Sequence, residues 1–399
     1  MIANTFMPIH LSDIVLDHDS YIALHEQLHN SLRQLIISGR WQTGERVPSE
    51  PRLAKHLNIS RSTIRIALQK AEIEGLITRQ AGRGTFVTYD ATLPNQNRVV
   101  AYVARSFHNE IHQVLLSTAE TELRSEGYNV LFSNARTNAD EVRILEQLLQ
   151  DNISGLLIWA NASVTPEQRA MLHTYQARNI PIVFIDRMVD GVKGDYVGCD
   201  NFGGTYALMQ HLFELGHTRI AYLTHNIDSL YPIEERYRGF QQAMQEQRYV
   251  DYQQWKITSP QSQVFMETDL TTLLDDHDDT FSNQVIDFIE KTSPRPTAIV
   301  CVNDALALLT MRAIRKMGLR VPEDISVVGF DDIQLAAYVD TPLTTVSQNA
   351  YAIGQLAAQS LLERLDGLSV PTRHHTVPTR LQIRMSATTP IEFNPAHKE

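Results

Sequence analysis

The sequence predicts an α/β protein in which a small, mostly helical head precedes a larger body built on parallel sheets. From Arg98 onward, short apolar runs alternate with amphipathic stretches of helical spacing, which is typical of parallel strands covered by helices. Residues 49–86 instead spell two short helices, a tight turn and a Gly-tipped hairpin. With 399 residues the chain is too long for one core, and the body exceeds one compact doubly wound unit. Two lobes are therefore expected in the body.

The head carries the start signals and the apolar spacing of two successive helices. Ser49 and Ser60 each precede a helical pattern and can accept a hydrogen bond from an N–H of the first turn. Ile59 and Ile64 have the spacing of a hydrophobic staple around the second start. The residues left outward at the beginning of the second helix are Arg61, Ser62, Thr63 and Arg65. A capped helix with this surface fits the major groove of DNA, so the segment predicts a winged helix-turn-helix.

Charge is divided unevenly between the head and the body. Residues 21–88 hold 10 Lys and Arg against 5 Asp and Glu, a net charge of +5. Residues 89–399 have a net charge of −13, within a chain total of −11. A basic head on an acidic body is typical of a protein whose head alone contacts phosphate. Double-stranded DNA is therefore the expected partner of the head.

Composition along the chain predicts four segments, of which the last is divided into two lobes. The expected bounds are 1–20 for a loose arm, 21–88 for the head, 89–97 for a polar linker and 98–390 for the body. Lobe 1 is expected to hold about 98–200 and 348–375, and lobe 2 about 201–347 and 376–390.

Seven apolar runs of the body predict strands. They cover residues 99–104, 129–133, 155–159, 181–186, 219–224, 298–302 and 325–330. Ligands of parallel sheets bind beyond the carboxyl ends of the strands. The polar side chains at these ends are Arg105, Asn134, Asp186, Asn303, Asp304, Asp331 and Asp332.

Several other functional classes are disfavoured by what the sequence lacks. Cys199 and Cys301 lie in apolar runs, which indicates buried thiols in a reducing cytoplasm. No apolar run approaches the roughly 18 residues of a membrane span, and no secretory signal precedes the head. A nucleophile elbow, a phosphate loop and a zinc motif are absent, so neither an enzyme nor a cofactor is expected. The acidic run 275–279 lacks the pattern of a calcium loop, and no metal site is expected.

The head resembles the DNA-binding domain of the GntR family. The resemblance is carried by QTGERVPSE (42–50), NISRSTIR (58–65) and EGLITRQAGRGTFV (74–87). It implies that the second helix contacts bases and phosphates, and that the wing tip reaches the minor groove. Where the family often has an arginine contact this chain has Pro51, so the contact is either lost or shifted to Arg52. The residues assigned to DNA are Arg52, Arg61, Ser62, Thr63, Arg65, Gly82, Arg83 and Gly84.

The body resembles the effector domain of LacI/GalR-type repressors, which has a periplasmic-binding-protein-like fold of two lobes. The motifs that carry the resemblance are ERYRGF (235–240), CVND (301–304), VPEDISVVGFDD (321–332) and PLTTV (342–346). A GntR-type head on this body resembles the family of arabinose repressors. The resemblance implies a small carbohydrate effector, with a pentose such as arabinose as the first to test.

Effector contacts are expected where the resemblance and the strand ends coincide. Arg236 has a planar fork that can hold two adjacent hydroxyls, although an ion pair with Glu234 or Glu235 is the alternative. Asp304 and Asp332 fit helix caps as well as ligand contacts. The residues assigned to the effector are Asp186, Arg236, Asn303, Asp331, Arg105 and Phe107. The other aromatic candidates, each more typical of core packing, are Trp159, Phe202 and Tyr231.

Together these features predict a cytoplasmic, homodimeric transcriptional repressor that a small sugar releases from its operator. Two alternatives remain within regulators, namely a corepressed protein and an activator, in both of which the ligand tightens DNA binding. A sugar-processing enzyme or a transport receptor is the alternative from a different class.

Overall fold

The computed structural model divides the chain into two compact units, Met1–Asn97 and Arg98–Glu399. The structure describes residues 11–17, 20, 23–37, 39–73, 75–80, 82–89, 98–105, 110–161, 163–225, 230–249, 256–259, 280–367 and 370–391. Four features named above lie outside these residues, namely the first ten residues of the arm, the linker from 90 to 97, Phe107 and the acidic run 275–279.

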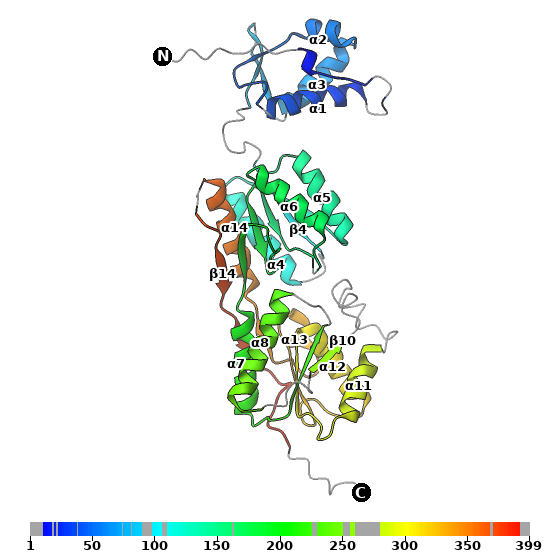
Figure 1. The fold of residues 1–399 in the computed structure, drawn as a ribbon, viewed down its shortest axis with the longest axis vertical. Helices are drawn as coiled ribbons and strands as arrows, with labels where there is room; N and C mark the ends of the chain where they lie inside the picture. Colours follow the sequence, from blue (N-terminus) through cyan, green and yellow to red (C-terminus); the bar gives the residue numbers. More distant parts are fainter. Residues whose placement is uncertain are drawn as a thin grey trace. The chain divides into compact units, whose positions relative to one another are not determined.

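The first unit is a three-helix head with a small antiparallel sheet (Figure 1). Its elements are α1 (Leu24–Ile37), β1 (Arg46–Val47), α2 (Glu50–Leu57), α3 (Arg61–Ile73), β2 (Ile77–Gln80) and β3 (Gly84–Val87). The strands follow the order β1-β3-β2, so the hairpin β2–β3 forms the expected wing. Leu28, Leu53 and Ile64 are fully buried together, because each helix turns its apolar stripe to one core. The winged helix-turn-helix is confirmed.

The two predicted helix caps behave differently. The Ser60 hydroxyl accepts a hydrogen bond from the Thr63 N–H at 3.1 Å, as expected of an N-cap. Ser49 occupies the N-cap position of α2 but makes no such side-chain hydrogen bond. Pro51 lies in the first turn of α2 and has no N–H to be capped, which lowers the number of orphan donors there.

The N-terminal arm differs from the loose segment that was expected. Residues 11–13 form a 3₁₀ turn, and Ile14 is buried in the core of the head. The Gln27 side chain both donates to the carbonyl of Asp17 and accepts from its N–H, at 2.9 and 2.8 Å. The apolar residues of this short stretch follow no helix or strand period, so their packing against the head is not predictable from the sequence.

Lobe 1 of the second unit is a six-stranded, wholly parallel sheet in the order β14-β8-β7-β6-β4-β5. Helices α4 and α14 pack together on one side, and α5 and α6 pack together beside the other core cluster of this lobe (Figure 1). The strands are β4 (Val99–Ala104), β5 (Asn129–Asn134), β6 (Gly155–Ile158), β7 (Ile182–Ile185), β8 (Asp195–Cys199) and β14 (His374–Val377). The helices are α4 (Glu110–Ser125), α5 (Asn138–Gln150), α6 (Pro166–Ala177) and α14 (Ala350–Leu365).

Lobe 2 is a four-stranded parallel sheet in the order β10-β9-β11-β12, beside a two-stranded antiparallel ribbon of β13 and β15. The strands are β9 (Ile220–His225), β10 (Lys256–Ser259), β11 (Ala298–Cys301), β12 (Ser326–Val328), β13 (Thr345–Ser347) and β15 (Arg380–Gln382). The helices are α7 (Asn201–Glu214), α8 (Tyr231–Glu246), α11 (Thr280–Lys291), α12 (Asp304–Lys316) and α13 (Gln334–Tyr338). Along the described elements, the chain crosses between the lobes three times, after β8, after β13 and after β14.

All seven expected strands of the body are present, and the predicted fold class is confirmed. Strand β8 escaped prediction because Asp195 and Gly198 interrupt its apolar residues. The buried carboxylate of Asp195 is paired with the guanidinium of Arg364 at 2.7 Å and with that of Arg373 at 3.4 Å. Pairing of this kind is what allows an acidic residue inside a central strand.

Candidate DNA interface and effector site

The exposed face of α3 presents the residues that the sequence assigns to DNA. Arg61, Ser62 and Arg65 are exposed and Thr63 is half-buried. The Ser62 and Thr63 hydroxyls each lie 2.7 Å from the hydroxyl of Ser60, which orders the first turn. Spaced four residues apart, the two arginines lie on the same side of the helix. The first turns of α3 therefore offer two cations on one side of the helix and two hydroxyls at its N-terminal end.

Arg65 is held in a small ion-pair network between α3, α2 and the wing. Its guanidinium lies 3.4 Å from a carboxylate oxygen of Glu50, while 64% of the side chain remains exposed. Glu50 also lies 4.0 Å from Arg79 on β2, and Arg79 pairs with Glu72 at 3.3 Å. Ion pairs this exposed hold a side chain weakly, so Arg65 can exchange Glu50 for a phosphate or a base.

The wing tip is a turn that needs two glycines with positive φ. Gly82 has φ 72° and Gly84 has φ 120°, and Arg83 is exposed between them. A Cβ on Gly84 would lie 2.7 Å from Nε of Arg46, so the side chain of Arg46 crosses the wing beside the turn. Arg46 was missed by the sequence prediction, although its position opposite Phe86 in the β1–β3 pair is visible once the sheet is known. Arg52 is exposed on α2.

In lobe 2, Arg236 is the centre of a buried polar network. From α8 its Nε donates to Oδ1 of Asn201 at 2.8 Å, and Nη1 donates to the carbonyl of Val302 at 2.7 Å. Nη1 also lies 3.3 Å from a carboxylate oxygen of Asp331, and the guanidinium stacks 3.8 Å from the ring centre of Phe330. Glu235, an alternative partner, pairs with Arg238 instead. The structure thus brings two predicted effector residues, Arg236 and Asp331, into contact.

Asp331 lies just beyond β12 in a backbone conformation that is unusual for a residue with a side chain. Its φ is 128°, and it is held there by a hydrogen bond from its N–H to the carbonyl of Val346. Gln348 donates to the same carboxylate oxygen that Arg236 contacts. Burial raises the pKa of Asp331 to about 6, against the opposing effect of Arg236. The carboxylate is therefore fixed in position by three neighbouring groups.

Asn303 and Asp304 lie at the start of α12, and the side chains of both make hydrogen bonds within the protein. The Asn303 side chain accepts from the Leu306 N–H at 2.9 Å and so caps the helix. The fully buried carboxylate of Asp304 accepts from the Ile333 N–H and from the Thr345 hydroxyl. Burial, with Asp331 nearby, raises the pKa of Asp304 to about 7. Asp332 was also an open choice, and it pairs with Arg384 at 2.6 Å.

In lobe 1, Asp186 stands at the end of β7 with one carboxylate oxygen unsatisfied. Its φ is 62°, only 7% of the residue is exposed, and Oδ1 has no hydrogen-bond partner among the described residues. Oδ2 lies 3.7 Å from Nε of Arg187. Burial raises the pKa of Asp186, and Arg187 and Arg236 oppose that rise. Arg236, on α8 of lobe 2, is therefore near enough to Asp186 of lobe 1 to favour its charged form.

Four further polar or aromatic side chains of lobe 1 are relevant to the site, namely His112, Glu141, Trp159 and Asn161. Of these, only Trp159 was a candidate from the sequence. The His112 ring on α4 stacks on Trp159 with ring centres 3.7 Å apart. Burial, with Arg187 nearby, lowers the pKa of His112 to about 3, so its imidazole is neutral at physiological pH. Among the described residues, His112 Nδ1, both amide atoms of Asn161 and Oε1 of Glu141 have no hydrogen-bond partner.

Glu141 and Arg105 complete this side of lobe 1. Oε2 of Glu141 accepts from the Asn161 N–H at 3.3 Å. Burial raises the pKa of Glu141 to about 7, and Arg105 is among the cations that oppose the rise. Arg105 is half-buried directly after β4, as expected from its place at a strand end. A helical polar residue such as His112 or Glu141 has no signal in a single sequence, because only the sheet topology brings it to the strand ends.

Comparison with known proteins assigns the chain to a family. Residues 24–87 match the model of bacterial regulatory proteins of the gntR family, and residues 209–387 match a periplasmic binding protein-like domain. The arabinose metabolism transcriptional repressor of Geobacillus stearothermophilus is 32% identical over 363 residues, which cover 86% of this chain and 92% of that protein. The chain belongs to the family of these repressors. It is a DNA-binding transcriptional repressor with a GntR-type head and a LacI-type body.

Other relatives agree with this assignment. The repressor of the same name from Halalkalibacterium halodurans is 29% identical, covering 84% of this chain and 87% of its own. A LacI family transcriptional regulator of Enterococcus faecium, solved with bound ribose, superposes with a TM-score of 0.60 at 22% identity. That alignment covers 73% of this repressor and 99% of the solved chain, and it supports the fold of the body. Within the described residues of the repressor, every helix is too short or too polar to cross a membrane.

Proposed function

We propose that this repressor is released from its operator by a small neutral sugar that binds between the two lobes. The observation that carries the proposal is the pairing of a fixed cluster in lobe 2, around Arg236 and Asp331, with unsatisfied buried groups in lobe 1. A sugar hydroxyl both donates and accepts, so it can satisfy a carboxylate oxygen, a neutral imidazole and an amide in one site. Trp159 offers an aromatic edge beside these groups.

The charge of the site favours a neutral sugar over a sugar phosphate. Asp186, Asp331 and Glu141 bring carboxylates to the same region as Arg105, Arg187 and Arg236. A phosphate dianion would have to approach carboxylates that are already buried, which costs free energy. The names of the two arabinose metabolism repressors reported above make L-arabinose the first sugar to test.

A thermal-shift screen tests the proposed effector. Purified repressor is melted with L-arabinose, D-ribose, D-xylose, D-glucose and their available phosphates. The proposal expects a neutral pentose to raise the melting temperature and the phosphate of the same sugar to have no effect. Stabilisation by sugar phosphates alone, or product formed from any sugar in a turnover assay, would contradict it. The second outcome would favour an enzyme.

On DNA, the head is proposed to read a near-palindromic operator as one half of a homodimer. Two α3 helices would then enter successive major grooves about 34 Å apart, each with Arg61 and Arg65 on base edges and Arg83 in the adjacent minor groove. Replacing Arg65 by Ala should abolish the operator shift in a gel and leave stabilisation by sugar intact. Loss of both activities together would point to a misfolded protein rather than to a DNA contact.

The surface of lobe 2 supports the homodimer. Three apolar side chains are unusually exposed there, Tyr338 by 78%, Ile383 by 63% and Met385 by 65%. They belong to adjoining segments, because the Met385 N–H bonds to the Pro342 carbonyl and the Leu343 N–H bonds to that of Ala336. A second copy of the chain is the occupant that a two-fold operator requires. Light scattering should give a dimer for the wild type and a monomer for Ile383→Asp with Met385→Asp.

The effect of the sugar on operator affinity decides between an induced repressor and its alternatives. If L-arabinose weakened the operator complex, the chain would act as an induced repressor. Tighter binding with the sugar would instead favour the corepressed or activating alternative. We place the repressor in the cytoplasm and assign it no catalytic role, since its proposed partner is operator DNA.

A further inference from the structure

Helix α3 buries its apolar side chains with one exception among the described residues. The buried ones, which pack into the core of the head, are Ile64, Ala67, Leu68 and Ala71. Ile66 is instead 49% exposed. It is one of two large apolar side chains on the surface of the described head, the other being Val15 of the arm. Because apolar surface left in water adds little to the stability of the fold, the exposed part of Ile66 is available to a partner.

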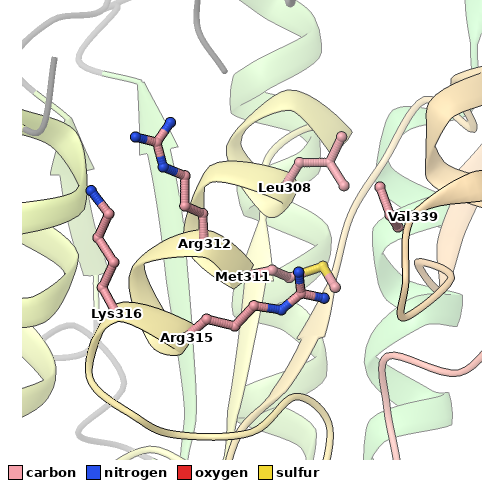
Figure 2. Close-up of a pocket in the computed structure, with 6 residues that line it drawn as sticks. All are labelled: Leu308, Met311, Arg312, Arg315, Lys316 and Val339. Atoms are coloured by element: carbon pink, nitrogen blue, oxygen red, sulfur yellow. The ribbon is translucent and has the colours of Figure 1, made fainter. Parts of the chain in front are cut away.

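The most exposed apolar side chains of the body, by contrast, already have a proposed partner. Among the described residues of the body these are Tyr338, Met385 and Ile383, on the face proposed above for the second copy of the chain. The hollow drawn in Figure 2 lies between α12 and Val339, the residue after Tyr338, and so adjoins the same face. Ile66 belongs to the other compact unit and to no part of that face.

Ile66 occupies the centre of the exposed face of α3. At 3.6 residues per turn, Ser62, Ile66 and Gln69 lie within about 30° of the line directly opposite the buried stripe. Arg65 lies roughly 70° to one side of that line, where its guanidinium meets Glu50 of α2 at 3.4 Å. The middle of the face therefore holds a hydroxyl, a branched aliphatic group and an amide, with Arg65 beside them.

The major groove of DNA offers a partner for such an aliphatic group. Of the four bases, thymine alone presents a methyl group there, on C5, and apolar side chains contact it. Ile66 follows Arg61 by five residues, or roughly 7.5 Å along the helix axis at 1.5 Å per residue. It therefore lies in the N-terminal part of the helix, which contacts base edges in helix-turn-helix proteins.

We propose that Ile66 packs on the C5-methyl group of a thymine in each operator half-site and so reads an A·T pair beside the bases contacted by the arginines. This contact rests on the proposed reading of operator DNA by α3, and it adds an apolar contact to the polar ones. Contacts to phosphates carry no sequence information, whereas a methyl contact favours thymine at its position. Ile66 therefore contributes to the choice of operator.

Deoxyuridine tests the contact because it differs from thymidine only in lacking the C5-methyl group. A fragment of the repressor's own promoter is prepared once with thymine and once with uracil at every such position. Each version is titrated with full-length protein by fluorescence anisotropy. Burying one methyl group changes affinity about fourfold, so two heads should favour the thymine fragment by about 15-fold. Ile66→Ala should bind the thymine fragment about tenfold more weakly and prefer it by less than about twofold.

Two further variants separate the methyl contact from a general loss of binding. Ile66→Val keeps a branched aliphatic group and should retain most of the preference for thymine. Val15→Ala is the matched control, since Val15 is an aliphatic residue of the same head that is 78% exposed and lies outside α3. It should keep both the affinity and the preference of the wild type. Because position 66 is exposed, Ile66→Ala should melt at the same temperature as the wild type.

The two fragments also distinguish failure of this contact from failure of operator binding. Equal affinity of the wild type for both fragments, or the same preference in the wild type and Ile66→Ala, would overturn the contact and leave the proposed operator binding intact. A wild type that bound neither fragment would overturn the proposed operator binding, and the methyl contact with it.

Discussion

The two lobes of the body present contrasting surfaces to the space between them. In lobe 2, Arg236 and Asp331 are each held by two or more partners, and Asp304 fixes the loop behind them. In lobe 1, the described polar groups around Asp186 and His112 include several atoms with no hydrogen-bond partner. Since unsatisfied buried polar atoms cost free energy, lobe 1 gains more than lobe 2 from a ligand that supplies hydroxyls.

This difference indicates a division of roles in the response to sugar. The pre-ordered cluster of lobe 2 can bind a sugar without rearrangement, while lobe 1 becomes satisfied only when it closes on that sugar. A ligand shifts an equilibrium only through differential affinity for its states, and the orphan groups of lobe 1 supply such a difference. Substitutions in the two lobes should therefore affect stability and sugar affinity in opposite proportions.

The largest effect is expected from removing the centre of the lobe 2 cluster. Replacing Arg236 by Ala leaves Asp331 buried without its cation, and should lower the free energy of unfolding by about 3–5 kcal/mol as well as abolish the sugar response. Operator binding should persist with sugar present. Urea denaturation and gel shifts measure the two effects. Arg238→Ala, on an exposed side chain of the same helix, should change stability by less than about 0.5 kcal/mol.

A loss of stability that develops between about pH 4.5 and pH 7 is expected from Glu141 in lobe 1. Burial raises the pKa of Glu141 from 4.5 to about 7, so between these values the folded protein binds a proton that the unfolded chain has lost. Stability from this residue is therefore lost as the pH rises. Replacing Glu141 by Gln should add about 2.5 kcal/mol at pH 8 relative to its effect at pH 5. The comparison uses thermal unfolding at both pH values.

The control for this pH effect is Glu146→Gln, on the exposed side of the same helix α5. It should leave the pH dependence of the wild type unchanged. A Glu141→Gln protein whose stability follows the wild type at both pH values would show that the carboxylate is not buried as described.

A substitution of Asp186 is expected to lower the affinity for sugar without lowering the stability of the fold. Asn is close to Asp in shape and also tolerates a positive φ, so Asp186→Asn should fold normally without sugar. Loss of the carboxylate acceptor should weaken sugar binding by about 10- to 100-fold, or 1–3 kcal/mol. Isothermal calorimetry measures the affinity. If the variant instead lost stability as Arg236→Ala does, the contrast between the lobes would fail.

The smallest effect should come from Asn303, which has both a structural and a predicted ligand role. Ser is as good an N-cap as Asn, so Asn303→Ser should keep stability within about 0.5 kcal/mol. The same variant lacks the amide nitrogen and should bind sugar about fivefold more weakly, by the loss of one hydrogen bond. Unchanged affinity would leave Asn303 with the helix cap as its whole role.

Much of this architecture was predictable from the sequence because its signals are local. The seven strands follow apolar runs, and the head follows from helix spacing, the cap at Ser60 and the paired glycines of the wing. The residues assigned from motifs, such as Arg236 and Asp331, also meet in the structure, since each follows or faces a strand end. Whether they contact DNA or sugar remains a prediction that the variants above examine.

The rest depended on contacts that no local pattern reveals. Strand β8 contains the carboxylate of Asp195. This carboxylate is paired with Arg364 of helix α14, which lies 169 residues later in the sequence. His112 and Glu141 sit on helices whose polar faces usually meet solvent, and only the chain's path through lobe 1 buries them. Ile14 belongs to the core of the head without any periodic partner in sequence.

Fluorescence anisotropy of a labelled fragment of the repressor's own promoter, titrated with protein at modest salt, tests the central claim most directly. With L-arabinose present, the account predicts that the wild type binds the fragment 5- to 150-fold more weakly, corresponding to a coupling of about 1–3 kcal/mol. The same operator affinity with and without every neutral sugar of the panel would contradict it.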